Sequence, residues 1–271
     1  MQIGSPVTAL WRLLCYVGFT LLIMPVQGTA LLLRLPLRST IPLWYHRRCC
    51  RILGIRVERR GRQSRSQPTL YVTNHSSYLD ITVLGSVIPG SFVAKSEVAG
   101  WFFFGWLARL QRTVFVERRA LRARDQRDAL ARRLDRGDNL ILFPEGTSDD
   151  GNRVLPFKSA LLSAAERRPQ GQPLVVQPVS VAYTKLDGLP LGRSLRPFFA
   201  WYGDMELAPH LWQLAGLGRL TVAVHFHQPV TLDDFGSRKR LSEHCQAKVA
   251  QGVALALSGR SSLSARAKAA A

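Results

Sequence analysis

The first residues that could carry out chemistry lie in TLYVTNHSSYLDITVL, residues 69 to 84. An apolar run stops there at Asn74 and His75, and Asp80 follows shortly after the histidine. A carboxylate bonded to one imidazole nitrogen fixes the tautomer and stabilises the imidazolium, so the other nitrogen can accept a proton as a general base. The stretch therefore contains a candidate acid–base pair.

The spacing of His75 and Asp80 limits where each of them can lie. Five residues on one regular helix turn through about 500°, which leaves the two side chains about 140° apart around the axis. The pair can meet only if His75 lies in the turn after a strand and Asp80 in the first turn of the following helix. The structural alternative is a Ser-x-x-acid capping box that begins at Ser77, in which Asp80 only accepts backbone N–H groups.

A second polar break follows the apolar run in LILFPEGTS, residues 140 to 148. Gly146 would let backbone N–H groups approach an oxyanion or a phosphate, while Glu145 and Thr147 would supply polar contacts. Lys158 follows in PFKSALL and could add a contact to the same phosphate. An ordinary Pro-Gly turn and a solvated lysine are the structural alternatives.

A third break ends the run TVFVERR, residues 113 to 119, at Arg118. Because arginine is planar and multidentate, at the end of a strand it can bind a phosphate through two hydrogen bonds. Further arginines lie close by in the sequence, so a solvated charged face is the alternative.

Short β-type runs alternate with helical runs from residue 55 onward, and this order predicts an α/β domain. Strands are expected at residues 55–59, 70–73, 91–94, 114–117, 139–143, 174–182 and 219–226. Helices are expected at residues 77–88, 98–110, 119–136, 155–166 and 240–257. We expect three regions: membrane-anchoring helices at 1–54, a catalytic domain at 55–258, and a disordered tail at 259–271.

The N-terminal region indicates membrane contact. Residues 13 to 33 contain no charged side chain, and about 20 such residues at about 1.5 Å each are enough to cross a hydrocarbon core of about 30 Å. Arginines cluster directly after this run, which predicts that the rest of the chain lies on the cytoplasmic face. A signal peptide and a buried core helix are alternatives, and Pro25 and Gly28 would permit a re-entrant bend. Residues 39 to 53 have the composition of an interfacial helix.

The 271 residues include 37 Lys and Arg against 18 Asp and Glu, a formal net charge of +19. Such a chain is attracted to anions, and an anionic membrane surface fits because the basic residues begin right after the apolar run. Solvated surface arginines account for many of these charges. The sequence has none of the usual nucleic-acid recognition motifs, so no nucleic-acid partner is expected. The four cysteines do not form a disulfide framework, which fits a reduced, cytoplasm-facing domain.

In this order, and behind a membrane segment, these stretches resemble the glycerolipid acyltransferase family, which includes the 1-acyl-glycerol-3-phosphate acyltransferases. Four blocks carry the resemblance: Asn74-His75 with Asp80, FVER at 115–118, FPEGT at 143–147 and VQPV at 176–179. The resemblance implies a central, mostly parallel sheet flanked by helices, with an N-terminal membrane-associated helical segment. It also implies a location on the cytoplasmic face of a bacterial inner membrane.

The resemblance further implies a mechanism. His75 would deprotonate the free hydroxyl of a lysolipid acceptor, which attacks the thioester of acyl-CoA or acyl carrier protein, while Asp80 orients His75. The expected substrate-binding set is Asn74, Arg118, Glu145, Gly146, Thr147 and Lys158. Family members use no acyl-enzyme, no metal and no cofactor apart from the acyl donor, in agreement with the lack of a G-x-S-x-G nucleophile elbow in the sequence.

Lysophosphatidic acid is the expected acceptor, and lyso-ornithine lipid is the alternative. Two departures from the family pattern, Arg112 and Ala160 at positions where glycine is common in the family, leave the acceptor open. Residues 203–212 and 219–230 resemble the branch that acylates lyso-ornithine lipid.

Two other classes of function compete with the enzyme. A zinc hydrolase could use His225 and His227, which share one face of a strand, but further ligands at metal-site spacing are not apparent in the sequence. A nonenzymatic tether that binds anionic lipids would explain the charge and the N-terminus. It would leave His75, Asp80 and the FPEGT turn unexplained.

Overall fold

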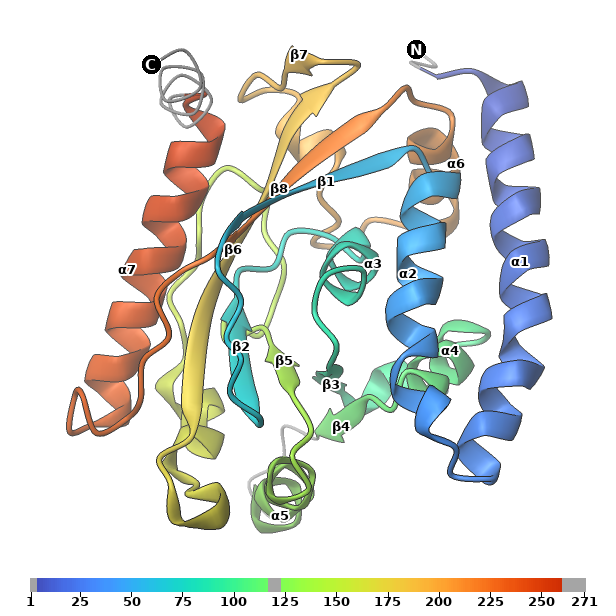
Figure 1. Ribbon diagram of the computed structural model, residues 1–271. Coiled ribbons are helices and arrows are strands. Elements are labelled where there is room, and N and C mark those ends of the chain that lie inside the picture. Colours follow the sequence, from blue (N-terminus) through green and yellow to red (C-terminus); the bar gives the residue numbers. More distant parts are fainter. Residues whose placement is uncertain (1–3, 117–122, 260–271) are drawn as a thin grey trace, which may run out of the picture.

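The computed structural model describes residues 4–116 and 123–259. Its centre is an eight-stranded sheet with the order β1-β8-β6-β2-β5-β3-β4, and β7 pairs with β6 at one side of that path (Figure 1). The strands are β1 Ile55–Gly61, β2 Thr69–Thr73, β3 Ser91–Lys95, β4 Val114–Val116, β5 Leu140–Leu142, β6 Val175–Leu186, β7 Leu189–Pro190 and β8 Leu220–Phe226. The helices are α1 Pro6–Leu32, α2 Ile41–Ile52, α3 Leu79–Gly85, α4 Phe104–Leu110, α5 Ala123–Asp135, α6 Leu207–Ala215 and α7 Arg238–Leu257.

The sheet is mostly parallel, as the resemblance implies. β2 pairs in parallel with both of its neighbours, β5 and β6, and β8 and β7 run antiparallel to β6. The residues of β2 and β5 are all buried, because helices cover both faces of a parallel sheet. The α/β prediction is therefore confirmed.

Alternate side chains of β2 belong to two separate hydrophobic cores. Leu70 packs with Leu241 of α7, on the face that Figure 1 shows covered by that helix. Tyr71 points to the opposite face and packs with Val83 and Leu84 of α3. This packing holds α3 against the face of the sheet.

Three predicted helices differ from those in the structure. The segment 98–110 is split into a 3₁₀ helix, η2 Ser96–Gly100, and α4, because Phe103 has a left-handed φ of 65°. The segment 155–166 forms the 3₁₀ helix η4 Ser159–Glu166, since the residue before it, Lys158, is extended. The segment 77–88 is shorter, as α3, and Pro89 follows close behind it.

The structure also contains two elements that were not predicted from the sequence, helix α6 and strand β7. Residues 119–122 of the helix predicted at 119–136, and the predicted tail from residue 260, lie outside the described residues.

Helix α1 begins at Ser5, whose hydroxyl accepts the backbone N–H of Thr8, and continues unbroken past Pro25. In the described part of the chain it is the one helix long and apolar enough to cross a membrane. Figure 1 shows α2 returning beside it, so the two form a helical hairpin. Arg12 ties α1 to the core, because its guanidinium donates to the backbone oxygens of Ala215 and Leu217 just after α6.

Candidate active site

The first two polar breaks of the sequence meet at one edge of the sheet. Val72 of β2 lies in register with Leu142 of β5, and the two strands are parallel. The segments that leave their carboxyl ends, Asn74-His75 and Phe143-Pro144, therefore lie side by side. The carboxyl ends of parallel strands are where α/β proteins place their ligand sites.

His75 and Asp80 face each other across the start of α3. His75 precedes the helix, Asp80 lies in its first turn, and Nδ1 of the histidine is 2.9 Å from Oδ2 of the aspartate. This is the geometry that the spacing required. Since a carboxylate oxygen accepts, Nδ1 carries the proton and Nε2 is left as the basic nitrogen.

Asp80 is fully buried and receives four hydrogen bonds. Its Oδ2 accepts from His75 Nδ1 and from the backbone N–H groups of Ser76 and Ser77, at 2.7 and 2.9 Å for the latter two. Its Oδ1 accepts from the Tyr183 hydroxyl at 2.6 Å. The geometry is compatible with both interpretations, because one carboxylate accepts the backbone N–H groups before the helix and hydrogen-bonds the histidine.

Tyr183 lies on β6, and sequence reasoning missed it. Burial raises the pKa of its phenol well above the usual value, so the group remains a donor. Tyr183 directly follows the strand predicted at 174–182. A single tyrosine there gives no sequence signal that links it to Asp80, about a hundred positions earlier.

Glu145 supports the backbone of the histidine. Its Oε1 accepts the His75 N–H at 3.3 Å, while its Oε2 has no hydrogen-bond partner among the described residues. The residue is 2% exposed, and burial raises the pKa of its carboxyl to about 8, with Asp80 and Asp149 adding to the effect. The side chain is therefore largely protonated at neutral pH and can donate a hydrogen bond.

The FPEGT turn brings Gly146, Thr147 and Lys158 together. Gly146 has a φ of 70°, a conformation that favours glycine, and its N–H closes the turn onto Phe143 at 3.1 Å. The Lys158 ammonium lies 3.3 Å from where a Cβ on Gly146 would be, and the Lys158 N–H donates to Pro144. Thr147 is exposed at the rim.

Asn74, another expected site residue, is engaged within the fold. The amide of Asn74 is engaged with β6: Nδ2 donates to the Val181 oxygen at 2.9 Å, and Oδ1 accepts the Val181 N–H at 2.8 Å. Asn74 thus holds the end of β2 in place rather than presenting its amide to a ligand. Arg118 lies outside the described residues.

An aromatic stack joins the histidine to the interior. The ring of His75 stacks on Phe143 at 4.2 Å, and Phe143 stacks on Phe92 at 6.3 Å between ring centroids. Phe92 and Tyr78 in turn line an apolar cavity of about 210 Å³. Other parts of its wall come from α1, α2, α3, α4 and α6, including Met24 and Leu211.

The loops around His75 carry both signs of charge. Asp149 donates its backbone N–H to the His75 oxygen at 3.3 Å and pairs with Arg153 at 2.7 Å. Arg196 donates to Asn152 at 3.1 Å. A site with carboxylates and guanidinium groups side by side suits a zwitterionic ligand better than a simple anion.

The zinc alternative finds little support in the geometry. His227 Nε2 lies 2.6 Å from the Ser180 hydroxyl, and within residues 4–116 and 123–259 no group of three potential metal ligands comes together. Arg112 has a left-handed φ of 63°, a conformation that glycine adopts without strain, and its guanidinium pairs with Asp138.

Comparison with known proteins bears on this geometry. Residues 54–182 match the family model described as Acyltransferase. A lyso-ornithine lipid O-acyltransferase of Brucella abortus is 42% identical over 248 residues, covering 90% of this chain and 93% of that protein. An enzyme of the same name from Rhizobium meliloti is 42% identical over 246 residues, 89% of this chain and 84% of that protein. A 1-acyl-sn-glycerol-3-phosphate acyltransferase of Neisseria gonorrhoeae is 30% identical over 212 residues, 76% of this chain and 78% of that protein.

A solved structure shares the fold. The crystal structure of the 1-acyl-sn-glycerophosphate acyltransferase of Thermotoga maritima matches with a TM-score of 0.61 at 23% identity, covering 91% of this chain and 93% of that chain. The chain belongs to the acyltransferase family. Its reaction is the transfer of an acyl group to a lysolipid, and the resemblance drawn from the four sequence blocks is confirmed.

Proposed function

We propose that His75 is the general base of this acyl transfer. Its Nε2 takes the proton of the acceptor hydroxyl while the oxygen attacks the thioester carbonyl of the donor. The tetrahedral intermediate then expels the thiolate, which takes the proton back from the imidazolium, so an ester and a free thiol leave. Asp80 stabilises the imidazolium, and the contact of 2.9 Å between Nδ1 and Oδ2 is the observation that carries the proposal.

The FPEGT turn is the proposed binding site for the acceptor's polar head. Lys158 contributes a positive charge beside Gly146, and protonated Glu145 contributes a donor next to the His75 backbone. Thr147, at the rim, and Arg118 are the further residues that we propose bind the polar head. Asn74 acts indirectly, by holding the end of β2.

Lyso-ornithine lipid is the acceptor we favour, ahead of lysophosphatidic acid. Two relatives that carry this activity in their names are 42% identical over most of the chain, against 30% for the 1-acyl-sn-glycerol-3-phosphate acyltransferase of Neisseria gonorrhoeae. Ornithine bears a carboxylate and an ammonium group, and the mixed charges of Asp149, Arg153 and Arg196 near His75 fit a head group of that kind.

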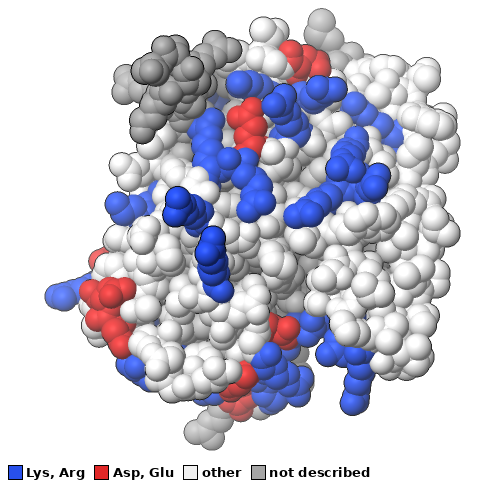
Figure 2. All heavy atoms as spheres, viewed as in Figure 1, with Lys and Arg blue, Asp and Glu red and all other residues white. Residues whose placement is uncertain are grey.

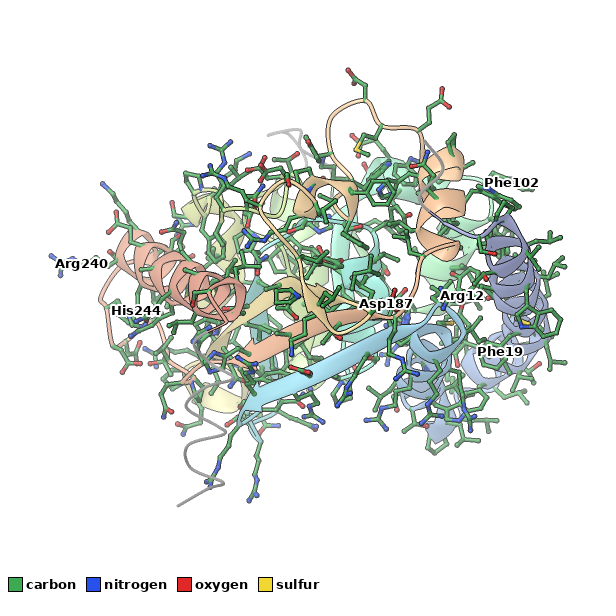
Figure 3. The ribbon with its side chains drawn as sticks, turned by 90° about the horizontal axis from the view of Figure 1, so that it is seen from above. Arg12, Phe19, Phe102, Asp187, Arg240 and His244 are labelled. Carbon is green, nitrogen blue, oxygen red and sulfur yellow. The ribbon has the colours of Figure 1, made fainter. Side chains whose placement is uncertain are left out.

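The apolar side of the molecule is the proposed membrane face. Figure 3 shows Phe102 on the same side as α1, and this ring is 95% exposed. Figure 2 shows few charged side chains over α1, while Lys and Arg gather over α2 and β1. An apolar surface beside a basic one fits a helical hairpin embedded in an anionic leaflet, with the sheet on the cytoplasmic side. The acyl chain of the donor, acyl-CoA or acyl carrier protein, would occupy the cavity behind His75.

A panel of acceptors tests the proposal. Purified protein in detergent or bilayer receives an acyl thioester and either lyso-ornithine lipid, lysophosphatidic acid or no acceptor, and release of free thiol is measured. We expect thiol release with lyso-ornithine lipid to exceed that with lysophosphatidic acid. A folded protein that acylates neither acceptor contradicts the function. His75→Ala is the matched variant, which should lose turnover but bind vesicles as the wild type does.

A further inference from the structure

The cavity behind the active site has a polar end. Gln27 lies on α1 and is only 4% exposed, although it faces a cavity whose walls are otherwise mainly apolar. Its Nε2 donates to the backbone oxygens of Arg38 at 3.0 Å and Leu110 at 2.9 Å. These two bonds fix the orientation of the amide, because only the nitrogen can donate. Its Oε1 is left buried, with no donor among the described residues.

His46 of α2 presents a second such atom at the same place. Its Nε2 lies 3.0 Å from Gln111 Oε1, and the amide nitrogen of Gln111 donates to the Gly90 oxygen. Nε2 therefore carries the proton, and Nδ1 is an acceptor. Burial lowers the pKa of the ring to about 4, so the neutral form is the one present. Nδ1 has no partner within the described residues.

The two acceptors belong to one cluster. Gln27 bonds to Leu110 and His46 bonds to Gln111, which are consecutive residues at the end of α4. Both side chains line the same cavity. His46 also lies against Gly85, where an added Cβ would clash with the imidazole ring. Asp80 is near the other end of α3, five residues before Gly85, which is roughly 7.5 Å along the helix axis at about 1.5 Å per residue. The polar end is thus separated from the catalytic pair by most of the length of α3.

Two buried acceptors without donors are costly unless a ligand or a water supplies hydrogen. We infer that this cavity selects an aliphatic chain that carries a hydroxyl group partway along its length, and that this hydroxyl donates its one hydrogen to Gln27 Oε1 or to His46 Nδ1. The inference rests on the proposed function, since the cavity serves the acyl chains of the reaction. The hydroxyl would sit several carbons from the reacting carbonyl, at the far end of α3. An unsubstituted chain would leave both acceptors unpaired or hydrated.

Competition between chains of equal length tests the inference. Hexadecanoyl-CoA is compared with the same thioester hydroxylated at successive mid-chain positions, and kcat/KM is measured for each with one lysolipid. A second arm uses the unsubstituted donor and acceptors whose own chain is hydroxylated, which tells donor from acceptor occupancy. We expect one position to be preferred by roughly fivefold to tenfold, the worth of one hydrogen bond.

Variants assign the preference to its atoms. Either His46→Phe or Gln27→Met, whichever removes the accepting atom, should bring the ratio of hydroxylated to unsubstituted turnover toward one, whereas Met24→Leu, in the same cavity, should keep it. A flat series with the wild type in both arms overturns the inference even if the variants fail to fold, and means that water alone fills the polar end. A preference that survives both variants also overturns it. Absence of turnover by the folded wild type with every chain, hydroxylated or not, would instead count against the proposed function.

Discussion

Replacing Asp80 with asparagine separates its two roles. The asparagine oxygen can still accept from His75 Nδ1 and from the two backbone N–H groups, and its Nδ2 can donate to the Tyr183 hydroxyl, which then acts as acceptor. The helix start is thus preserved, and the main loss is the negative charge beside the imidazolium. Two unit charges about 4 Å apart attract by about 4 kcal/mol at an effective dielectric constant of about 20.

That energy sets the size of the expected effect. A loss of about 4 kcal/mol from the transition state lowers the rate by roughly a thousandfold. The assay is thiol release from the acyl thioester at saturating lysolipid, with a thermal melt to show that the variant folds. Tyr183→Phe is the matched control, because it removes one of the four hydrogen bonds and keeps the charge; it should cost roughly tenfold or less. A folded Asp80→Asn protein with turnover within about fivefold of the wild type would show that Asp80 is only a cap.

Three further predictions follow from single residues. Burial raises the pKa of the Glu145 carboxyl to about 8 in the folded chain, against about 4.3 in an unfolded one. The folded chain therefore binds this proton more tightly, and the free energy of unfolding falls as the pH rises from about 4.3 to about 8. The melting temperature of Glu145→Gln should therefore fall less over this range than that of the wild type, and parallel curves would contradict the pKa. Gly146→Ala places a Cβ at a φ of 70° and should destabilise the fold by about 1–2 kcal/mol, as measured by denaturation; an unchanged midpoint would refute the strain. Phe102→Ser removes a ring that is 95% exposed and should weaken binding to anionic vesicles by roughly tenfold or more; equal partition of both proteins would place this face away from the membrane.

The sequence predicted those parts of the fold that local patterns determine. All seven expected strands are present, because continuous apolar runs between turns are typical of buried parallel strands. The order of strands and helices was enough to predict the α/β class. The errors came where one backbone conformation interrupts a run of helical composition, as at Phe103, whose left-handed φ splits the predicted helix at 98–110 into two pieces.

The candidate site was predictable only in part. His75 and Asp80 are close in sequence, so helix geometry alone could decide how they meet. Tyr183 and the Asn74–Val181 pair depend on β6 lying next to β2, which no local pattern gives. The polar end of the cavity was also beyond reach, because Gln27 and His46 come from different helices.

Helix α1 is one wall of the cavity as well as the apolar surface of the molecule. Met24 and Gln27 face inward, while Leu21 and Leu22 beside them are exposed. The same helix therefore serves both the membrane anchor and the acyl-chain cavity. Removing it to obtain a water-soluble enzyme would open the cavity along one side. Conversely, exchanging this helix between relatives should transfer chain preference together with the anchor, since its inner face lines the cavity.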